Sequence, residues 1–346
     1  MHTKDAIGII VNGLFYCVAI NSVSPAPVFR QEDAGAGCHF ESRLEGDMMS
    51  TDLSRRKFIS TSAISASLAA FMTQTHTSAR AVQVYKGSGR PLRLGLMTHT
   101  LAKDWDIDTI IKNCRETKFE HAELRTTHAH RVEVSLTKAQ RKEVRKKFED
   151  AGIKISLASA FMYHLEDQKM VRENVEGTKA YSVLAHDIGA IGIRVFANAI
   201  LVNKGIPEEK TLEQIGKALA EVGEFAHDYG VEIRVSNHGK GTNDVARIKK
   251  IIDYSGSKHV YMNWNCDKTD IEGVGFQAKF NMVKDRIRNL HIHDLTNEKY
   301  PYRKLFALLR DSGYQGYCDA EIKASPEPIR LMRYYRALFL ALQNVY

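Results

Sequence analysis

The sequence is poor in cysteine, and this limits what can hold the fold together. Five cysteines occur in 346 residues, and three of them, Cys114, Cys266 and Cys318, follow residue 81. An odd number without paired spacing argues against a disulfide framework. No CxxC pattern is present either, which argues against a structural zinc site of that type.

Long apolar runs and basic stripes are also missing. The segment GIIVNGLFYCVAI, residues 8–20, is apolar but shorter than the roughly 20 residues of a membrane-spanning helix. The net charge is +8, yet basic runs such as KAQRKEVRKKFED, residues 138–150, have the apolar spacing of a helix with a solvated face. No basic stripe interleaved with aromatic residues occurs, so we expect no nucleic-acid partner.

Residues 49–81 contain the three parts of an export signal in the right order. Arg55 and Arg56 are followed by a modestly apolar stretch rich in serine and alanine, and 79–81 read Ala-Arg-Ala. A short amphipathic helix after a chance arginine pair is the alternative. We expect a twin-arginine signal peptide, recognised by the twin-arginine export machinery, and a periplasmic or extracytoplasmic protein exported in folded form.

The position of this signal raises a question about residues 1–48. Export signals stand at the start of a protein, and Met48 and Met49 lie immediately before this one. We therefore expect translation to begin there, with residues 1–48 as an upstream or unstructured extension and residues 82–346 as the working domain.

The working domain contains eight short apolar segments typical of strands. They are RLGLMTH (93–99), FEHAELRTT (119–127), IKISLASAF (153–161), IGIRVFANA (191–199), VEIRVSNHG (231–239), VYMNWNCD (260–267), IRNLHIHD (287–294) and YCDAEI (317–322). Amphipathic stretches that stop at AGIK, IGAIG, DYGV and DSGY separate them. Alternating strands and helices of this number predict a single (β/α)8 TIM barrel of the α/β class. A doubly wound open sheet is the alternative, but no GxGxxG follows the first strand.

Side chains alternate along these strands, and the two sets differ in chemistry. One set is apolar, for example Leu94, Leu290 and Ile292, and we expect it to pack under the helices. The other set is polar toward the strand ends, where barrel active sites lie. Its members are His99, Glu123, Arg125, Asn198, Ser236, His238, Asn265, Asp267, His291, His293 and Glu321.

Two motifs near the C-terminus resemble those of the xylose isomerase-like barrels, which include sugar phosphate isomerases and epimerases. HIHD occupies 291–294, and GYQGYCDAE runs from 313 to 321. ELRTTHAH (123–130) and a WN-x-x-x-TD motif from Trp264 are similar to those of an exported branch of the family. The resemblance covers residues 92–346 and implies the barrel fold and a sugar substrate.

The resemblance also implies a divalent metal held by four strand-end residues. His291 and Glu321 match two of the family's ligands, whereas Ser236 and Asn265 stand where the family has carboxylate-type ligands. This exchange removes two negative charges and weakens the site for a hard or borderline dication. We expect Mn, Mg, Zn or Co on His291, Glu321 and Asn265.

The function implied is metal-dependent proton transfer on a hydroxy-ketone sugar or keto-sugar by an isomerase or epimerase. Ser236 leaves the usual acid/base position empty, so Glu321, His238 and Glu123 are the candidate catalytic groups. The candidate substrate contacts are His99, Arg125, His128, His130, Asn198, Ser236, Asp267 and His293.

Several of these residues have simpler interpretations. Glu123 and Arg125 could form an ion pair, Asp267 could cap a helix or loop, and His128 and His130 could be solvated loop histidines. Trp264 has the outward parity and is expected to pack. The alternative functions are a non-catalytic barrel that binds sugars or sugar acids, and a keto-glycoside lyase; a homo-oligomer is left open.

Overall fold

The computed structural model describes residues 7–11, 14–18 and 89–345. The chain divides into two units, Met1–Ala79 and Arg80–Tyr346. In the first, β1 (Ile7–Val11) and β2 (Leu14–Val18) pair as an antiparallel hairpin. The predicted signal peptide, residues 49–81, lies outside the described residues. Within the described part, no helix is long and apolar enough to cross a membrane.

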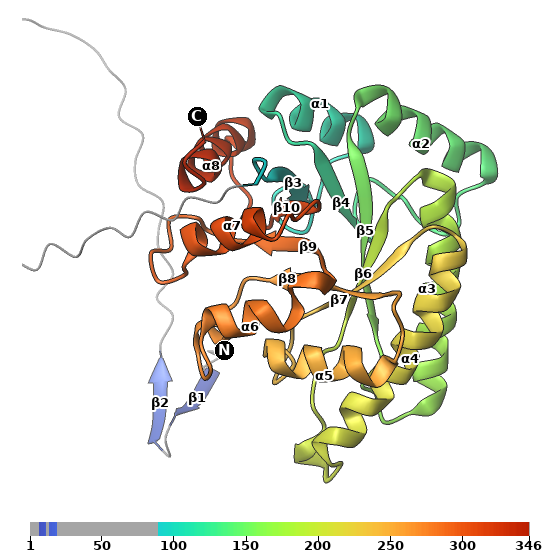
Figure 1. Ribbon diagram of the computed structural model, residues 1–346, viewed down its shortest axis with the longest axis vertical. Coiled ribbons are helices and arrows are strands. Elements are labelled where there is room, and N and C mark those ends of the chain that lie inside the picture. Colours follow the sequence, from blue (N-terminus) through green and yellow to red (C-terminus); the bar gives the residue numbers. More distant parts are fainter. Residues whose placement is uncertain (1–6, 12–13, 19–88, 346) are drawn as a thin grey trace, which may run out of the picture. The chain divides into compact units, whose positions relative to one another are not determined.

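The second unit is built on a closed barrel of parallel strands, as predicted (Figure 1). The strands follow one another around the barrel in chain order, and the last pairs with the first. They are β3 (Arg93–Met97), β4 (His121–Arg125), β5 (Lys154–Met162), β6 (Gly192–Phe196), β7 (Glu232–Ser236), β8 (Val260–Asn265), β9 (Ile287–Ile292) and β10 (Tyr317–Ala320). All eight lie within or next to the predicted segments.

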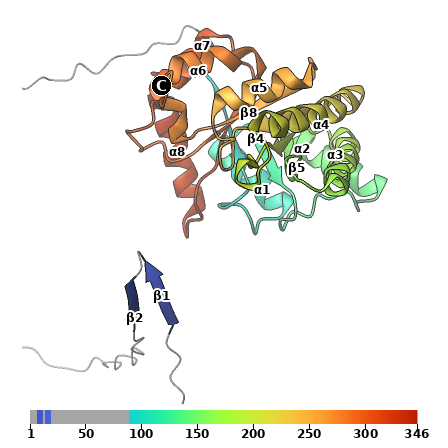
Figure 2. The same ribbon diagram turned by 90° about the horizontal axis from the view of Figure 1, so that it is seen from below.

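Helices follow each strand and surround the barrel (Figure 2). They are α1 (Ile107–Thr117), α2 (Lys138–Ala151), α3 (Gln168–Ile188), α4 (Glu208–Asp228), α5 (Val245–Ser255), α6 (Phe276–Val283), α7 (Tyr302–Asp311) and α8 (Pro328–Leu342). Three short 3-10 turns are η1 (Val202–Lys204), η2 (Lys268–Ile271) and η3 (Lys284–Arg286).

The helix ends follow local chemistry. The Asp106 side chain accepts a hydrogen bond from the Thr109 backbone at the start of α1, and Thr137 and Gln140 form a capping box on α2. Gly152 and Gly189 end α2 and α3 with φ of 70° and 75°, a left-handed conformation that glycine adopts without strain. These caps set where each chain segment turns back into the next strand.

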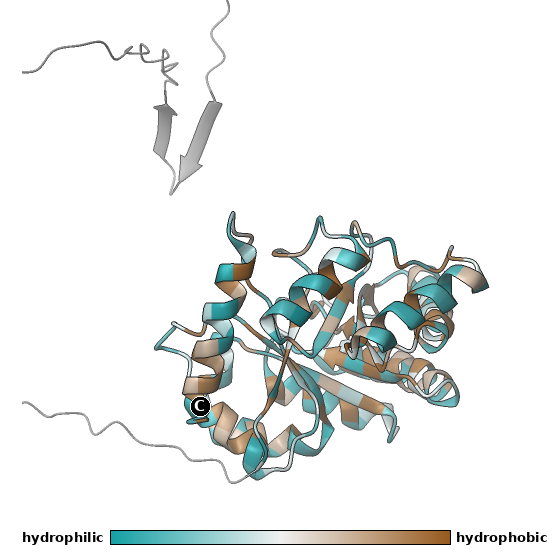
Figure 3. Cartoon of the chain, turned by 90° about the horizontal axis from the view of Figure 1, so that it is seen from above, coloured by the Kyte–Doolittle hydropathy of each residue, from teal (hydrophilic) through white to brown (hydrophobic). Residues whose placement is uncertain are grey.

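The hydrophobic core lies between the outer side of the strands and the helices. Leu94, Leu290 and Ile292 are buried there, as the alternation predicted. Trp264 is also buried, packs on Phe276 and Phe280, and is thus a packing residue. Along the helices, hydrophilic and hydrophobic residues alternate as amphipathic helices require (Figure 3).

The three cysteines of the barrel are free and buried. None of these three cysteines forms a disulfide. The apolar core between strands and helices, rather than a disulfide among these cysteines, stabilises the barrel. The inner side of the strands carries polar residues instead.

Candidate active site

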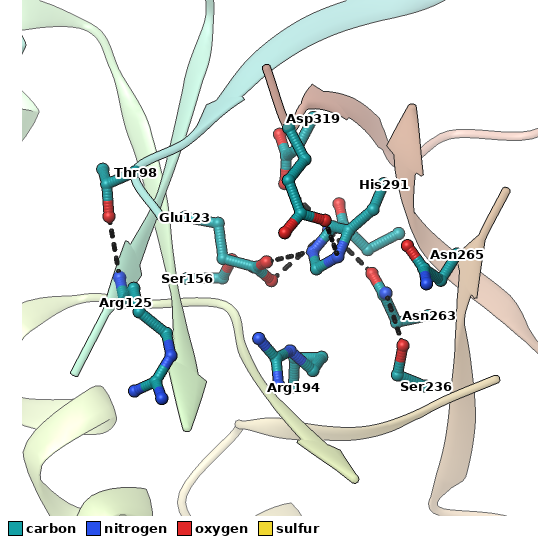
Figure 4. Close-up of polar contacts among 12 residues, drawn as sticks. Thr98, Glu123, Arg125, Ser156, Arg194, Ser236, Asn263, Asn265, His291 and Asp319 are labelled. Carbon is teal, nitrogen blue, oxygen red and sulfur yellow. Dashed lines mark hydrogen bonds and ion pairs between the residues drawn. The ribbon is translucent and has the colours of Figure 1, made fainter. Parts of the chain in front are cut away.

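A buried ion pair crosses the barrel interior between β4 and β9. The Nε2 of His291 on β9 hydrogen-bonds the Oε2 of Glu123 on β4, and both side chains are almost completely buried (Figure 4). Ser156 donates to Glu123 Oε1 at 3.2 Å, and the Asn289 amide donates to the same oxygen at 3.4 Å. Glu123 therefore pairs with His291, and the alternative of an ion pair with Arg125 is wrong.

A second carboxylate contacts His291 from the carboxyl end of the barrel. Glu321 follows β10, and its Oε2 lies 3.4 Å from His291 Nδ1 and 3.9 Å from His293 Nδ1. Its side chain keeps 22% exposure, whereas that of Glu123 has none. The three residues Glu123, His291 and Glu321 are called the carboxylate–imidazole cluster below.

The cluster is charged. Burial by itself would lower the pKa of His291, but Glu123 and Glu321 raise that pKa to about 10. Burial would raise the pKa of each carboxyl, but His291 holds the pKa of Glu123 and of Glu321 below the ordinary range. At neutral pH, His291 is therefore an imidazolium between two carboxylates.

Neighbouring amides and hydroxyls extend this network across β7 and β8. His293 Nε2 lies 3.1 Å from Asn265 Oδ1, which brings the expected ligand Asn265 beside the cluster. Ser236 accepts a hydrogen bond from Asn263 at 3.2 Å. The sequence positions that lack carboxylates thus hold neutral hydrogen-bonding groups on the inner face.

Deeper in the barrel lies a polar layer that sequence reasoning missed. His121 Nδ1 lies 2.7 Å from Asp319 Oδ1, and Asn289 donates to Asp319 Oδ2 at 2.8 Å. Gly95 makes room for this carboxylate, because a Cβ on Gly95 would lie 1.8 Å from Asp319 Oδ1. Asp319 shares its strand parity with Glu321, a signal that could have revealed it.

Arg194 on β6 is a further inner-face residue that the sequence did not single out. Its guanidinium is buried, donates from Nη1 to the Ser159 carbonyl at 2.9 Å, and lies 4.0 Å over the Phe196 ring. Among the described residues its Nε has no hydrogen-bond partner. Burial lowers the pKa of Arg194 to about 10, so it remains a cation at neutral pH.

Histidines from four loops stand near the strand ends. His99 and His128 stack with ring centroids 6.0 Å apart, and His238 packs on Phe196 at 4.7 Å. Burial lowers the pKa of His99 and of His293, and it lowers that of His128 to about 4. These rings are neutral at pH 7 and can donate or accept hydrogen bonds to sugar hydroxyls.

Two predicted substrate contacts have other roles. His130 is buried, with Nε2 against the Arg125 carbonyl at 2.8 Å and Nδ1 accepting from the Val132 backbone at 3.1 Å. Both ring nitrogens are therefore used within the loop. Asp267 caps η2 by accepting from the Thr269 backbone at 2.9 Å, and it also accepts from Asn243. Local hydrogen bonding explains both residues better than a sugar does.

Arg125 and Asn198 also form hydrogen bonds within the protein. Arg125 Nη1 donates to both the carbonyl and the hydroxyl of Thr126. Asn198 has φ of 52°, and its carbonyl accepts from Thr242, which fixes the loop after β7. Its side-chain Oδ1 lies 3.4 Å from His238 Nδ1, so Asn198 also orients that ring.

The residues present do not fit the expected metal. Among residues 89–345, no three His, Cys, Asp or Glu side chains are grouped to hold an ion. Both nitrogens of His291 face carboxylates, which raise its pKa and so favour the protonated imidazole, a form that cannot bind a metal. His291, Glu321 and Asn265 are thus brought together, but as a hydrogen-bonded network.

Comparison with known proteins gives the family. Residues 111–338 match the family model for the xylose isomerase-like TIM barrel, and the chain belongs to that family. No curated protein matches the chain.

Several solved structures share the fold at low sequence identity. An L-ribulose 3-epimerase is 17% identical with a TM-score of 0.62, covering 73% of this chain and 95% of its own. The 3-keto-D-glucoside 4-epimerase YcjR from E. coli is 15% identical with a TM-score of 0.60, covering 72% and 99%. The IolI protein, solved with a zinc atom, is 16% identical with a TM-score of 0.59, covering 73% and 98%.

Proposed function

We propose that this protein is an isomerase or epimerase that moves a proton on a hydroxy-ketone sugar or keto-sugar. The observation that carries the proposal is His291, whose two ring nitrogens face Glu123 and Glu321 at the carboxyl end of the barrel. Proton transfer beside a carbonyl needs a base and a positive group that stabilises the oxyanion. The family and the sugar epimerases among the similar structures support this reaction class.

The two carboxylates have different roles in this proposal. Glu321 is partly exposed and within reach of a substrate, so it is the proposed base. Glu123 is fully buried behind His291 and acts as a positioning residue that keeps the imidazole protonated. The imidazolium beside Glu321 stabilises the negative charge that develops on the sugar oxygen.

Substrate entry adjusts the strength of the base. In the free protein His291 keeps the pKa of Glu321 low, which makes Glu321 a weak base. A sugar that covers the carboxylate removes water from it, and desolvation raises a carboxyl pKa. His238, held against Phe196, is the proposed second group that returns a proton.

The test is incorporation of solvent deuterium into a panel of ketoses and keto-sugars by the full chain. We expect exchange at the carbon beside the carbonyl, lost by at least about 100-fold in Glu321→Gln, as for a general base. Glu224→Gln, on the outer surface of α4, is the matched control and should retain the parent rate. Exchange that survives in Glu321→Gln contradicts the assignment of the base.

A non-catalytic sugar or sugar-acid binder is the second candidate. It is favoured by Ser236, which stands where the family resemblance implies a metal-binding carboxylate. Its hydroxyl instead accepts a hydrogen bond from Asn263. Calorimetric titration with the same sugar panel separates the two candidates. Saturable binding without any deuterium exchange supports the binder.

We also propose that residues 49–81 direct export of the folded protein through the twin-arginine machinery. Arg55 and Arg56 carry this proposal. Replacing both with lysine should leave the protein in the cytoplasm, as measured by fractionation of the expressing bacterium. Unchanged export in the double variant contradicts the assignment.

A further inference from the structure

The inner face carries less negative charge and more positive charge than a metal site needs. Ser236 and Asn265 are neutral, and the remaining carboxylates of the cluster, Glu123 and Glu321, both contact His291. Arg194 adds a second buried cation on the same inner face. Such a site offers fixed organic cations where a dication requires anionic ligands.

Arg194 is held in place without being neutralised. The hydrogen bond to the Ser159 carbonyl and the contact with the Phe196 ring fix the guanidinium. A buried arginine with a purely structural role is normally paired with a carboxylate. Arg194 makes no ion pair among the described residues, although Glu123 and Glu321 both act on it electrostatically.

Arg194 lies in the same part of the barrel interior as the cluster, and the carboxylates of Glu123 and Glu321 both raise its pKa. In the close-up, Arg194 is drawn near Glu123 and His291, and no hydrogen bond or ion pair joins it to the labelled residues (Figure 4). Nε is buried without a partner, and Nη1 is the nitrogen used by Ser159. The Nε–Nη2 edge thus has no hydrogen-bond partner among the described residues, and a guanidinium edge of this kind binds the two oxygens of a planar group in a bidentate manner.

We propose that Arg194 supplies the positive charge that a metal ion would otherwise supply, and that it binds the two oxygens of the planar enediolate formed from the sugar. The inference rests on the proposed function for the identity of the reaction. Glu321 removes the proton from the carbon beside the carbonyl, the electron pair forms the enediolate, and the same proton or one from solvent is returned. No oxidant, reductant or second substrate is needed.

Oxalate is a suitable probe, because it presents a planar pair of oxygens on adjacent carbons as a cis-enediolate does. Binding to the full chain is measured by calorimetry after chelation of metals with EDTA, and again with Mn²⁺ or Zn²⁺ restored. We expect metal-free binding that weakens at least about tenfold in Arg194→Gln and less in Arg194→Lys, because lysine keeps the charge but loses the fork.

Arg234→Gln is the matched control. Arg234 is a buried arginine on β7 at the register position paired with Arg194, but it is bonded to Glu232 at 2.6 Å. This variant should keep oxalate binding at temperatures where it is folded. Circular dichroism of each variant shows whether the fold is intact, and Arg194→Lys provides a test if Arg194→Gln does not fold.

Three results overturn the inference: oxalate binding that requires added metal, binding unchanged in Arg194→Gln, or no binding in any condition. Two other results distinguish failure of the proposed sugar reaction from failure of the role assigned to Arg194. Oxalate binding that depends on Arg194, without deuterium exchange on any sugar, would support the oxyanion site and contradict the sugar reaction. Deuterium exchange into the sugar that stops on chelation and returns with added metal would support the reaction and contradict the role of Arg194.

Discussion

The two faces of the same eight strands have opposite chemistry. On the outer face, residues such as Leu94, Leu290 and Ile292 are buried against the helices. On the inner face, Glu123, His291 and other polar groups are equally buried but bonded to one another. Burial of apolar area stabilises the barrel, whereas buried charges cost free energy unless they are paired. The difference indicates that the outer face maintains the fold and the inner face is kept for chemistry.

The largest effect on stability is expected from the outer face. Ile292→Ala removes a fully buried side chain between β9 and the helices and should lower the free energy of unfolding by about 2–5 kcal/mol. Chemical denaturation measures this loss. Oxalate binding per folded molecule should stay at the parent value, and a change in that affinity would show that the two faces are not independent.

Overfilling the inner face should cost less stability but should reach the site. In Gly95→Ala the new methyl group would lie 1.8 Å from Asp319 Oδ1, and that carboxylate is held by His121 and Asn289. Forced displacement of this kind costs about 1–3 kcal/mol. The same denaturation experiment measures it, and a parent-like stability would contradict the close packing of the layer below the cluster.

Restoring a carboxylate tests whether Arg194 opposes metal binding. Ser236→Glu alone should gain little zinc affinity, because the new carboxylate has a guanidinium cation on the same inner face. Ser236→Glu combined with Arg194→Gln should bind zinc at least about tenfold more tightly, or about 1.4 kcal/mol. Equal affinity of the single and double variants in calorimetry would show that Arg194 does not affect the metal preference.

The smallest expected effect is a difference in pKa between His291 and His128. His291 has its pKa raised to about 10 by the carboxylates, and burial lowers that of His128 to about 4. Because the folded pKa of His291 exceeds its ordinary value of 6.5, its contribution to stability is complete below pH 6.5 and is lost as pH rises through about 10. The lowered carboxyl pKa of Glu123 acts in the other direction, and its contribution is lost as pH falls below about 4.5.

NMR titration of the labelled imidazoles follows this difference directly. At pH 8, His291 should be protonated and His128 neutral. The Glu123→Gln variant should bring the His291 pKa down while leaving that of His128 in place. Equal titration of the two rings near pH 6.5 is the result that the electrostatics of the site do not allow.

The sequence predicted the fold and part of the site, for physical reasons that differ. Alternation places Leu290 and Ile292 outside and His291 inside because strand side chains have a period of two. The same rule could have found Arg194 in IGIRVF and Asp319 in YCDAE, which share parity with inner residues. Both lie within strands β6 and β10, whereas the family motifs mark the residues at the strand ends.

Loop residues were less predictable than strand residues. His130 and Asp267 lie near the same end of the barrel as the site, but each is bonded to backbone groups a few residues away. Such local bonds depend on the path of the loop, which no periodicity specifies. The ion pair between Glu123 and His291 likewise depends on closure of the barrel, which brings together residues distant in the chain.

The central claim is that the inner face performs proton transfer with its own charged side chains. The most direct measurement is the rate of solvent-deuterium incorporation into a ketose by one preparation of the full chain, before and after chelation of metals. We predict the same rate in both conditions. A rate that disappears on chelation and returns with added Mn²⁺ or Zn²⁺ would contradict the account.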